Sequence, residues 1–439
     1  MKNLRPYCFC SVLMCLSVGV MPARADVFSQ CPTDTDGDGF SDDPNVVCMH
    51  VAAGDGFVNM ADDGRRLMYM FGFADITGVP DSEAMLAGML AAEFPAPTIV
   101  LKEGQQLYLS LTNVGMMVRP DLFDPHTVHW HGFPQAASIF DGVPEASVSI
   151  NMGATFTYFY NVVEPGTYMW HCHVEATEHM QMGMLGNIYV RPLQDGTTYE
   201  YPLGSGRFYD KFAYNDGDGS TGYDVDYPIQ IHSFDPVFHD ASFTTQPLPF
   251  ANMNDTFGML NGRGYPDTVN TAELLNTADD EGWEARYSQK VHSLIEATQG
   301  EKVLLRLSNL SVTKFYTLTV LGIPMRVVGQ GARLLRGPGG ADLSYETSSV
   351  TLGGGEAKDV ILDTALVDPG TYFLYTTNLN YLSNDTEDFG GMMTEIVVAP
   401  AAIPLRGDVP AEEVTKPKRE GAPGATRNFR SVERIRGKG

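Results

Sequence analysis

Short runs in which apolar and polar residues alternate recur along the chain and are bounded by turn-forming residues. Leu107–Leu111 reads LYLSL and Val303–Leu307 reads VLLRL, and Lys-Glu-Gly and Pro-Gly turns lie nearby. Alternation with a period of two places successive side chains on opposite faces of a strand. Because such runs, rich in Val, Ile, Leu, Tyr and Thr, recur between turns, the pattern predicts an all-β protein.

The strand pattern occurs twice, in the same order. In the first half, four segments follow one another: LKEGQQLYLSLTN, HTVHWHGFP, EPGTYMWHCH and GMLGNIYVRP. In the second half, their counterparts are ATQGEKVLLRLSN, YTLTVLGIP, DPGTYFLYTT and GMMTEIVVAP. This repeat predicts two tandem β-sandwich modules, at residues 66–195 and 226–400. The Gly- and Asp-rich stretch 196–225 between them is predicted to be a linker.

The chain begins with a basic and then apolar segment that ends at Ala23-Arg24-Ala25. This order of charge, apolar core and small residues predicts a secretory signal peptide at residues 1–25. No later stretch approaches the roughly 20 continuous apolar residues that a membrane helix needs. We therefore expect an exported protein, periplasmic or extracellular, with no membrane span.

The chain is strongly acidic, with a formal net charge of −25 over its 439 residues. An acidic surface repels nucleic acid and anionic membranes, and it favours cationic partners or metal ions. The C-terminal stretch 401–439 differs, because it is basic, rich in Pro and Gly and poor in large apolar residues. It is predicted to be a disordered tail.

One stretch concentrates side chains that bind metals. Gly166–Met184 reads GTYMWHCHVEATEHMQMGM and contains Cys172, His179 and Met184, and His126 lies upstream in HTVHWHG. A thiolate with two imidazoles and a long axial thioether is the ligand set of a blue, or type 1, copper site. These four residues are therefore predicted to bind copper, and an inert buried thiol is the alternative interpretation of Cys172.

Four further histidines occur in pairs separated by one residue. His129 and His131 form one pair, and His171 and His173 form the other. On a strand, residues two apart lie on the same face, so each pair is expected to point one way and Cys172 the opposite way. The spacing therefore predicts two separate metal sites.

These residues make the chain resemble the multicopper oxidases. HTVHWHGFP is similar to the family's H-x-x-H-x-H-G run, and the stretch from His171 to Met184 is similar to its H-C-H…H-x-x-x-G-M run. The resemblance implies two tandem cupredoxin-like Greek-key β-sandwich domains. It also implies that the four paired histidines hold half of a three-copper cluster, which receives electrons from Cys172 through His171 and His173. Asp141 stands where the family keeps a proton-supplying acid, and a turn aspartate is the alternative.

The second repeat lacks these ligands. Only the methionine persists, as Met392, and it is expected to be a core residue. The other positions carry residues that are not copper ligands of this type: Tyr316, Thr319, Leu321, Tyr375, Thr376 and Thr377. We therefore expect the second module to be a scaffold and subunit-contact domain.

Three cysteines follow the predicted signal peptide: Cys31, Cys48 and Cys172. If Cys172 binds copper, Cys31 and Cys48 remain to form a disulfide in an oxidising compartment. Between them an acidic segment has the spacing of a calcium loop without its final glutamate, with the candidate ligands Asp34, Asp36, Asp38 and Asp42. Residues 26–65 are thus expected to be an acidic disulfide loop, for which calcium binding and simple solvation both fit.

The resemblance implies an exported oxidoreductase that takes electrons from a small-molecule or protein donor and reduces O₂. Four imidazoles are half of a full cluster, so either two subunits complete it or it holds fewer coppers. Related two-domain proteins are trimers, which implies a homotrimer in which a neighbour's second module supplies surface and one ligand from His232, His239 or His292. The alternatives are a copper-binding or electron-transfer protein without O₂ turnover, and a nitrite reductase-like enzyme.

Overall fold

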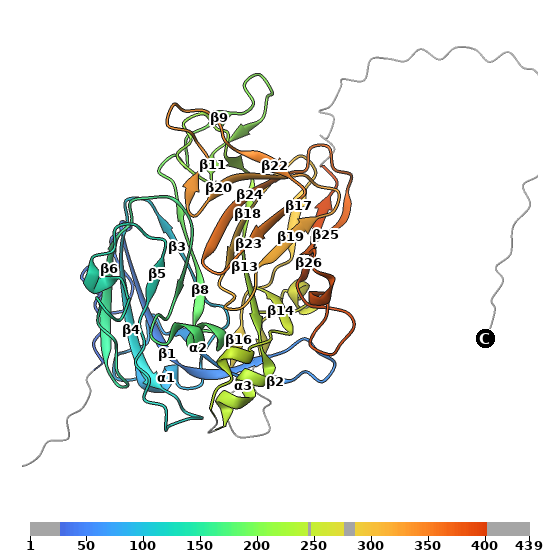
Figure 1. The fold of residues 1–439 in the computed structure, drawn as a ribbon. Coiled ribbons are helices and arrows are strands. Elements are labelled where there is room, and N and C mark those ends of the chain that lie inside the picture. The colour runs from blue at the N-terminus through green and yellow to red at the C-terminus, as the bar shows by residue number, and fades with distance from the viewer. Residues whose placement is uncertain (1–26, 245–246, 276–285, 402–439) are drawn as a thin grey trace, which may run out of the picture. The chain divides into compact units, whose positions relative to one another are not determined.

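The computed structural model describes residues 27–244, 247–275 and 286–401 (Figure 1). The predicted signal peptide and C-terminal tail lie outside the described residues. The described chain is built mainly of strands, and none of its helices is both long and apolar enough to cross a membrane. Its three α-helices are short: α1 (Ala84–Gly88), α2 (Ala176–Gln181) and α3 (Pro236–Phe243).

The first module is a sandwich of two four-stranded sheets. One sheet has the order β2-β1-β4-β6, formed by Leu67–Asp75, Val46–Asn59, Gln106–Gly115 and Thr155–Asn161. The other has the order β3-β8-β7-β5, formed by Ala96–Lys102, Leu185–Arg191, Gly166–His171 and His129–His131. The core between the sheets contains Phe71, Trp130, Trp170 and Cys172, all of them buried.

The second module has the same plan with longer sheets. Its first sheet has the order β14-β13-β18-β24-β20-β21, formed by Phe257–Leu260, Val225–Phe234, Lys302–Asn309, Glu356–Asp363, Met325–Gln330 and Arg333–Leu334, and β22 (Tyr345–Thr347) also pairs with β20. Its second sheet has the order β17-β26-β25-β19-β23, formed by Ile295–Thr298, Met393–Ala399, Gly370–Thr376, Tyr316–Val320 and Ser349–Leu352. Two short strands, β15 (Leu274–Leu275) and β16 (Tyr287–Gln289), pair separately.

The two modules repeat each other strand by strand, which confirms the predicted tandem all-β sandwiches. The parallel pair β1–β4 corresponds to β13–β18, and the parallel pair β3–β8 corresponds to β17–β26. The antiparallel pair β7–β8 likewise corresponds to β25–β26. Each repeated sequence segment therefore occupies the same place in both sandwiches.

The segment 26–65 differs from the loop expected there. Its disulfide between Cys31 and Cys48 is present, but Val46–Asn59 forms β1, the strand between β2 and β4. The first sandwich thus begins before residue 66. Most of β1 is buried along a continuous run, so its sequence lacks the period-two alternation that marks a strand with one exposed face.

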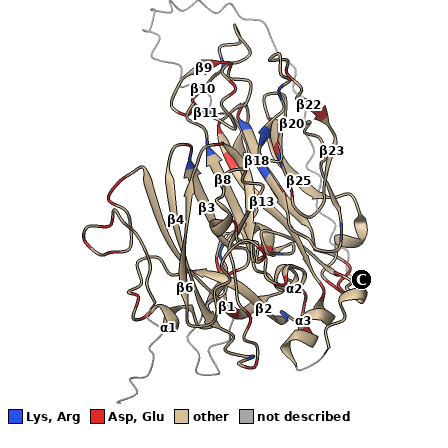
Figure 2. Cartoon of the chain, turned by 60° about the vertical axis from the view of Figure 1, so that its left-hand side comes forward, with Lys and Arg blue, Asp and Glu red and all other residues tan. Residues whose placement is uncertain are grey.

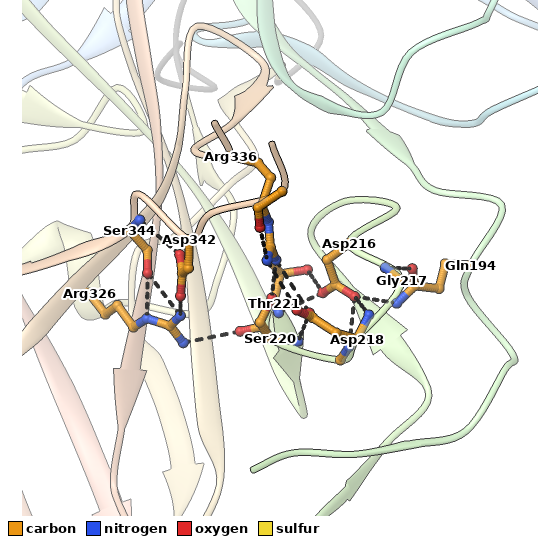
Figure 3. A network of polar contacts seen from close by, with 12 residues as sticks. Gln194, Asp216, Gly217, Asp218, Ser220, Thr221, Arg326, Arg336, Asp342 and Ser344 are labelled. Atoms are coloured by element: carbon orange, nitrogen blue, oxygen red, sulfur yellow. Dashed lines mark hydrogen bonds and ion pairs between the residues drawn. The ribbon is translucent and has the colours of Figure 1, made fainter. Parts of the chain in front are cut away.

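The stretch 196–225 is ordered rather than a plain linker. It contains the short strands β9 (Tyr199–Glu200), β10 (Phe208–Tyr209), β11 (Lys211–Phe212) and β12 (Gly222–Tyr223). In Figure 3 the Asp216 carboxylate accepts hydrogen bonds from Thr221, and Arg336 reaches Asp218 and Ser220 from the second module. The stretch is therefore attached to the second module.

A buried polar cluster joins the two modules. Asp359 on β24 is fully buried and accepts hydrogen bonds from Thr167 on β7, at 2.6 Å, and from the hydroxyl of Tyr214, at 2.5 Å. Arg306 on β18 is also fully buried, and its Nε lies 2.9 Å from Asp226. Figure 2 shows basic positions on β18 and β20, in a chain whose charged residues are mostly acidic. The buried polar cluster around Asp359 fixes one side of the first module against the second.

Candidate metal centres

Cys172, His126 and His179 come together in the core of the first module. The Sγ atom of Cys172 lies 3.2 Å from Nδ1 of His179 and 3.8 Å from Nδ1 of His126. One donor atom from each residue lies within 4.8 Å of the others, and all three side chains are fully buried. They come from three places in the fold: the end of β7, helix α2 and a bridge between His126 and Ile150.

Met184 is tied to this group through its backbone. Its N–H donates to the carbonyl of His179 at 2.8 Å, and its carbonyl accepts from the N–H of Cys172 at 3.1 Å. The Met184 side chain is fully buried in the same core. The four residues predicted for a type 1 site are thus neighbours in the fold, and their binding of copper stays a prediction.

The electrostatics of the first group suit a metal ion. Burial lowers the pKa of His179 to about 4 and holds the pKa of His126 well below its ordinary value, so both imidazoles are neutral, the form that ligates metals. Burial also raises the pKa of Cys172 to about 11. The thiol therefore stays protonated near neutral pH unless a cation stabilises the thiolate, and the Thr127 N–H, 3.5 Å from Sγ, also favours the thiolate. Thiol, imidazole and thioether together fit copper.

A second group lies on the opposite face of the same sheet. Strands β5 and β7 are antiparallel, and their register pairs His129 with His171. Donor atoms of His129, His131 and His171 all lie within 4.8 Å of one another. Nδ1 of His129 donates to the carbonyl of Asp141 at 2.6 Å, and Nδ1 of His171 donates to the carbonyl of Cys172 at 2.8 Å. These bonds leave a lone pair on each Nε2 for a metal, and Nε2 of His171 lies 3.3 Å from Nδ1 of His131.

His173 lies near this group without joining the close triad. Its ring centroid is 5.1 Å from that of His129 and 5.7 Å from that of His171. Strand β7 ends at His171, so the strand does not include Cys172 or His173. The alternation of side-chain directions that was expected from His171 to His173 therefore does not continue past His171. The chain then follows a path set by Thr127, whose Oγ1 accepts from the His173 N–H at 3.1 Å.

Asp141 and Thr127 both contact the histidine groups. Asp141 holds His129 through its backbone carbonyl, and its carboxylate Oδ1 lies 3.7 Å from Nδ1 of His129. Thr127 was not among the expected site residues, although it bonds Cys172 Sγ through its N–H and the His173 N–H through its hydroxyl. Its position directly after His126 is the one sequence signal that could have indicated this role.

The imidazoles of the second group line a cavity of about 460 Å³. Its opposite wall comes from the second module of the same chain and contains Leu310, Ser311, Val312, Thr313, Lys314, Phe315, Gly354 and Gly355. Gly355 has a φ of +87°, and a Cβ there would lie 3.0 Å from Nε2 of His131. Glycine adopts this positive φ without strain, and a side chain at this position would crowd His131. The wall carries no imidazole, although a neighbouring subunit was expected to face this site.

The three histidines considered as extra ligands lie outside both groups. His232 is buried against Phe94 and Phe234, and neither of its ring nitrogens has a hydrogen-bond partner among the described residues. His239 directs both ring nitrogens at backbone carbonyls of the first module. His292 belongs to none of the metal-capable groups found in the described chain. Within a single chain, these three histidines are therefore not placed to supply a ligand to either group.

In the second module, the positions that correspond to the predicted copper ligands of the first carry other residues. Thr376 occupies the place of Cys172, and its N–H donates to the carbonyl of Met392 at 3.1 Å, which repeats the bond between Cys172 and Met184. Met392 is fully buried in the second core. The second module thus keeps this backbone hydrogen bond, while the positions that correspond to Cys172 and the first module's histidines carry neither a thiol nor an imidazole.

The acidic loop gathers three of its four candidate calcium ligands. Donor atoms of Asp34, Asp36 and Asp38 lie within 4.8 Å of one another. Asp42 is not in that group, because its carboxylate accepts hydrogen bonds from Thr35. The Asp34 carboxylate accepts hydrogen bonds from the backbone N–H groups of Gly37 and Gly39, which lowers its pKa. These bonds also account for the conformation of the loop without a bound ion. Calcium binding stays a prediction.

The chain matches the multicopper oxidase family over residues 79–195 and again over residues 241–398. It belongs to the multicopper oxidase family. Copper is the cofactor of this family, and both groups of donor side chains are suited to it. The two matched stretches fall in the two sandwich modules, and both groups lie in the first.

Individual multicopper oxidases and related proteins resemble the chain at low identity. Putative laccase-17 of Oryza sativa subsp. japonica is 24% identical over 287 residues, which are 64% of this chain and 41% of that protein. The chain thus spans about two-fifths of the length of this curated relative.

Two solved structures from Nitrosomonas europaea share the fold. A blue copper oxidase has a TM-score of 0.56 at 21% identity, covering 80% of this chain and 85% of that one. A copper nitrite reductase has a TM-score of 0.51 at 16% identity, covering 81% and 93%. These likenesses show that the tandem arrangement of sandwiches is common to both types of copper protein.

Proposed function

We propose that this protein is an exported copper-dependent oxidoreductase that oxidises a small-molecule or protein donor and reduces O₂. His126, Cys172, His179 and Met184 would hold one copper, and His129, His131, His171 and His173 would hold the second site. Copper bound at the first group would accept single electrons, and copper bound at the second would reduce O₂.

The observation that carries this proposal is the covalent link between the two groups. Cys172 belongs to the first group, and its direct neighbour His171 belongs to the second. One peptide unit therefore connects a thiolate in the core with an imidazole on the cavity wall. The Nδ1–H of His171 donates to the carbonyl of Cys172 at 2.8 Å, which adds a hydrogen-bonded connection between the same residues.

The remaining residues orient these donors and exclude water. The Asp141 carbonyl fixes the tautomer of His129, so that its Nε2 faces away from the bond. The Asp141 side chain is partly exposed and lies beside the same ring, where it can pass protons to the cavity. The first group is sealed from solvent, because His126, Cys172 and His179 are each 0% exposed.

Copper content and O₂ consumption test the proposal together. We expect O₂ consumption with an added reductant, and close to four coppers per subunit, or half that number if clusters are shared between subunits. One copper per subunit without O₂ consumption would replace it with an electron-transfer or copper-binding protein. That second candidate is favoured by the cavity wall of the second module, which carries no imidazole.

A homotrimer is the assembly that we propose, because four imidazoles are only half of the family's cluster. The second module of the same chain already forms the opposite wall of the cavity, so a neighbouring copy would supply the missing ligands there. Light scattering of the copper-loaded protein is expected to give three times the mass of the chain. A monomer with full O₂ turnover would contradict this assembly, since a single chain would then complete the site.

A further inference from the structure

Helix α3 belongs to the second module but packs on the first. Asp235 caps its N-terminus by accepting from the N–H of Val237 at 2.9 Å. At its other end, Arg119 of the first module donates to the carbonyl of Thr244 at 2.9 Å, and the ring centroid of Phe243 lies 5.5 Å from that of Tyr69 on β2. The helix is therefore held at both ends, and its side chains have fixed positions against the first module.

His239 lies in the middle of α3 and contacts two elements of the first module. Its Nδ1 is 2.6 Å from the carbonyl of Tyr69 on β2, and its Nε2 is 3.0 Å from the carbonyl of Gln181, the last residue of α2. The side chain is fully buried. Carbonyls in the last turn of a helix have no partner within the helix, so the bond from His239 satisfies a group that would otherwise be buried alone.

Gln181 begins the tight turn that joins two predicted copper ligands. Gly183 has a φ of +114°, and a Cβ there would lie 2.9 Å from the carbonyl of Phe71, so the turn is closed against β2. The N–H of Phe71 donates to the carbonyl of Met182 at 3.0 Å. His179 and Met184, on either side of the turn, are joined by a backbone bond of 2.8 Å.

We propose that His239 is a positioning residue through which the second module fixes the copper-binding turn of the first. In the tautomer that carries the ring N–H on Nε2, the hydrogen bond to the Gln181 carbonyl holds the end of α2, and thereby sets where His179 and Met184 stand relative to Cys172. This rests on the proposed type 1 copper site. The ring nitrogens of His239 contact the carbonyls of Tyr69 and Gln181, and neither residue is a predicted copper ligand. The second module would therefore tune the copper site without supplying a ligand to it.

Two substitutions separate the contacts that the two ring nitrogens of His239 make with backbone carbonyls. Burial lowers its pKa to about 4, so the neutral ring carries one N–H for two carbonyls. The amide nitrogen of glutamine reaches the place of Nε2, and that of asparagine reaches the place of Nδ1. His239→Gln therefore keeps a donor for Gln181, whereas His239→Asn keeps a donor for Tyr69 and loses the bond to α2.

The test compares wild type, His239→Gln and His239→Asn, with His232→Phe as the matched control. His232 is equally buried in the second module, and its ring nitrogens have no hydrogen-bond partner with good geometry among the described residues. In the copper-loaded proteins, we expect His239→Asn to shift the visible band, the spin-resonance spectrum and the reduction potential. His239→Gln and His232→Phe should keep the wild-type values. Equal spectra in His239→Asn and His239→Gln would overturn the proposal.

Hydrogen exchange of the metal-free proteins gives a readout that does not depend on copper. The N–H groups of Met182, Gly183 and Met184 all donate within the turn. Loss of the bond to Gln181 should speed the exchange of these N–H groups roughly tenfold in His239→Asn. The reason is that losing one buried hydrogen bond shifts a local opening equilibrium by about this factor. Unchanged exchange would overturn the positioning role. A wild-type protein without a blue band would instead overturn the copper assignment, while the exchange result still decides the role of His239.

Discussion

The Sγ atom of Cys172 lies 3.2 Å from Nδ1 of His179, although one residue follows strand β7 and the other lies on helix α2. Both side chains are fully buried. A thiol whose pKa is raised by burial and a neutral imidazole thus face each other in an apolar core. Such a pair gains most from a metal cation, because the cation stabilises the thiolate that burial disfavours.

Replacing Cys172 with serine is expected to abolish the visible colour of the copper-loaded protein and leave the fold intact. A strong thiolate-to-copper charge-transfer band requires the sulfur, and a hydroxyl at the same place has no equivalent. Absorption and circular dichroism spectra measure the two effects. A Cys172→Ser protein that stays blue with wild-type intensity would rule out the proposed site.

Replacing His129 with alanine should remove O₂ consumption and lower the copper content while the blue band remains. His129 lies on the cavity face of the sheet, whereas Cys172 lies in the core on the other side. The two sites should therefore be separable by mutation. An oxygen electrode and metal analysis give the result, and full O₂ turnover in His129→Ala would show that the second site is not catalytic.

Replacing Asp359 with alanine is expected to lower the free energy of unfolding by about 3–5 kcal/mol, because buried Arg306, whose Nη1 lies 3.9 Å from the Asp359 carboxylate, loses one of its partners. Asp359 also accepts hydrogen bonds from Thr167 and Tyr214, so the loss includes the contact between the modules. Denaturation with urea measures the change. Asp342→Ala is the control, since its ion pair with Arg326 is partly exposed and should contribute at most about 1 kcal/mol. Equal effects would show that burial of the cluster is unimportant.

The metal-free protein should lose stability as the pH falls below about 6.5, the ordinary pKa of histidine. Burial lowers the pKa of His232 to about 3 and that of His239 to about 4. Between these values and about 6.5 the unfolded chain binds protons that the folded chain does not, so unfolding becomes more favourable as the pH falls. Denaturation at a series of pH values measures the slope. His232→Phe should make it shallower, and an unchanged slope would contradict the buried neutral state of His232.

Much of both groups of candidate metal-binding residues was predictable because their signals are local. Residue type and spacing placed Cys172 between two histidines, and the period of two put His129 and His131 on one face of β5. The four repeated segments likewise predicted two sandwiches, because each strand carries its own apolar pattern. Membership of the multicopper oxidase family agrees with that interpretation.

The amino-acid sequence alone determined the strands, the repeat and the kinds of donor atoms, because these follow from side-chain chemistry and short-range periodicity. Tertiary structure decided the rest. β1 joins the first sheet through a parallel pairing with β4, and His239 reaches Gln181 from another module. The wall that faces the imidazoles likewise comes from the second module. Such contacts depend on which distant surfaces pack together, and no local pattern of residues encodes that choice.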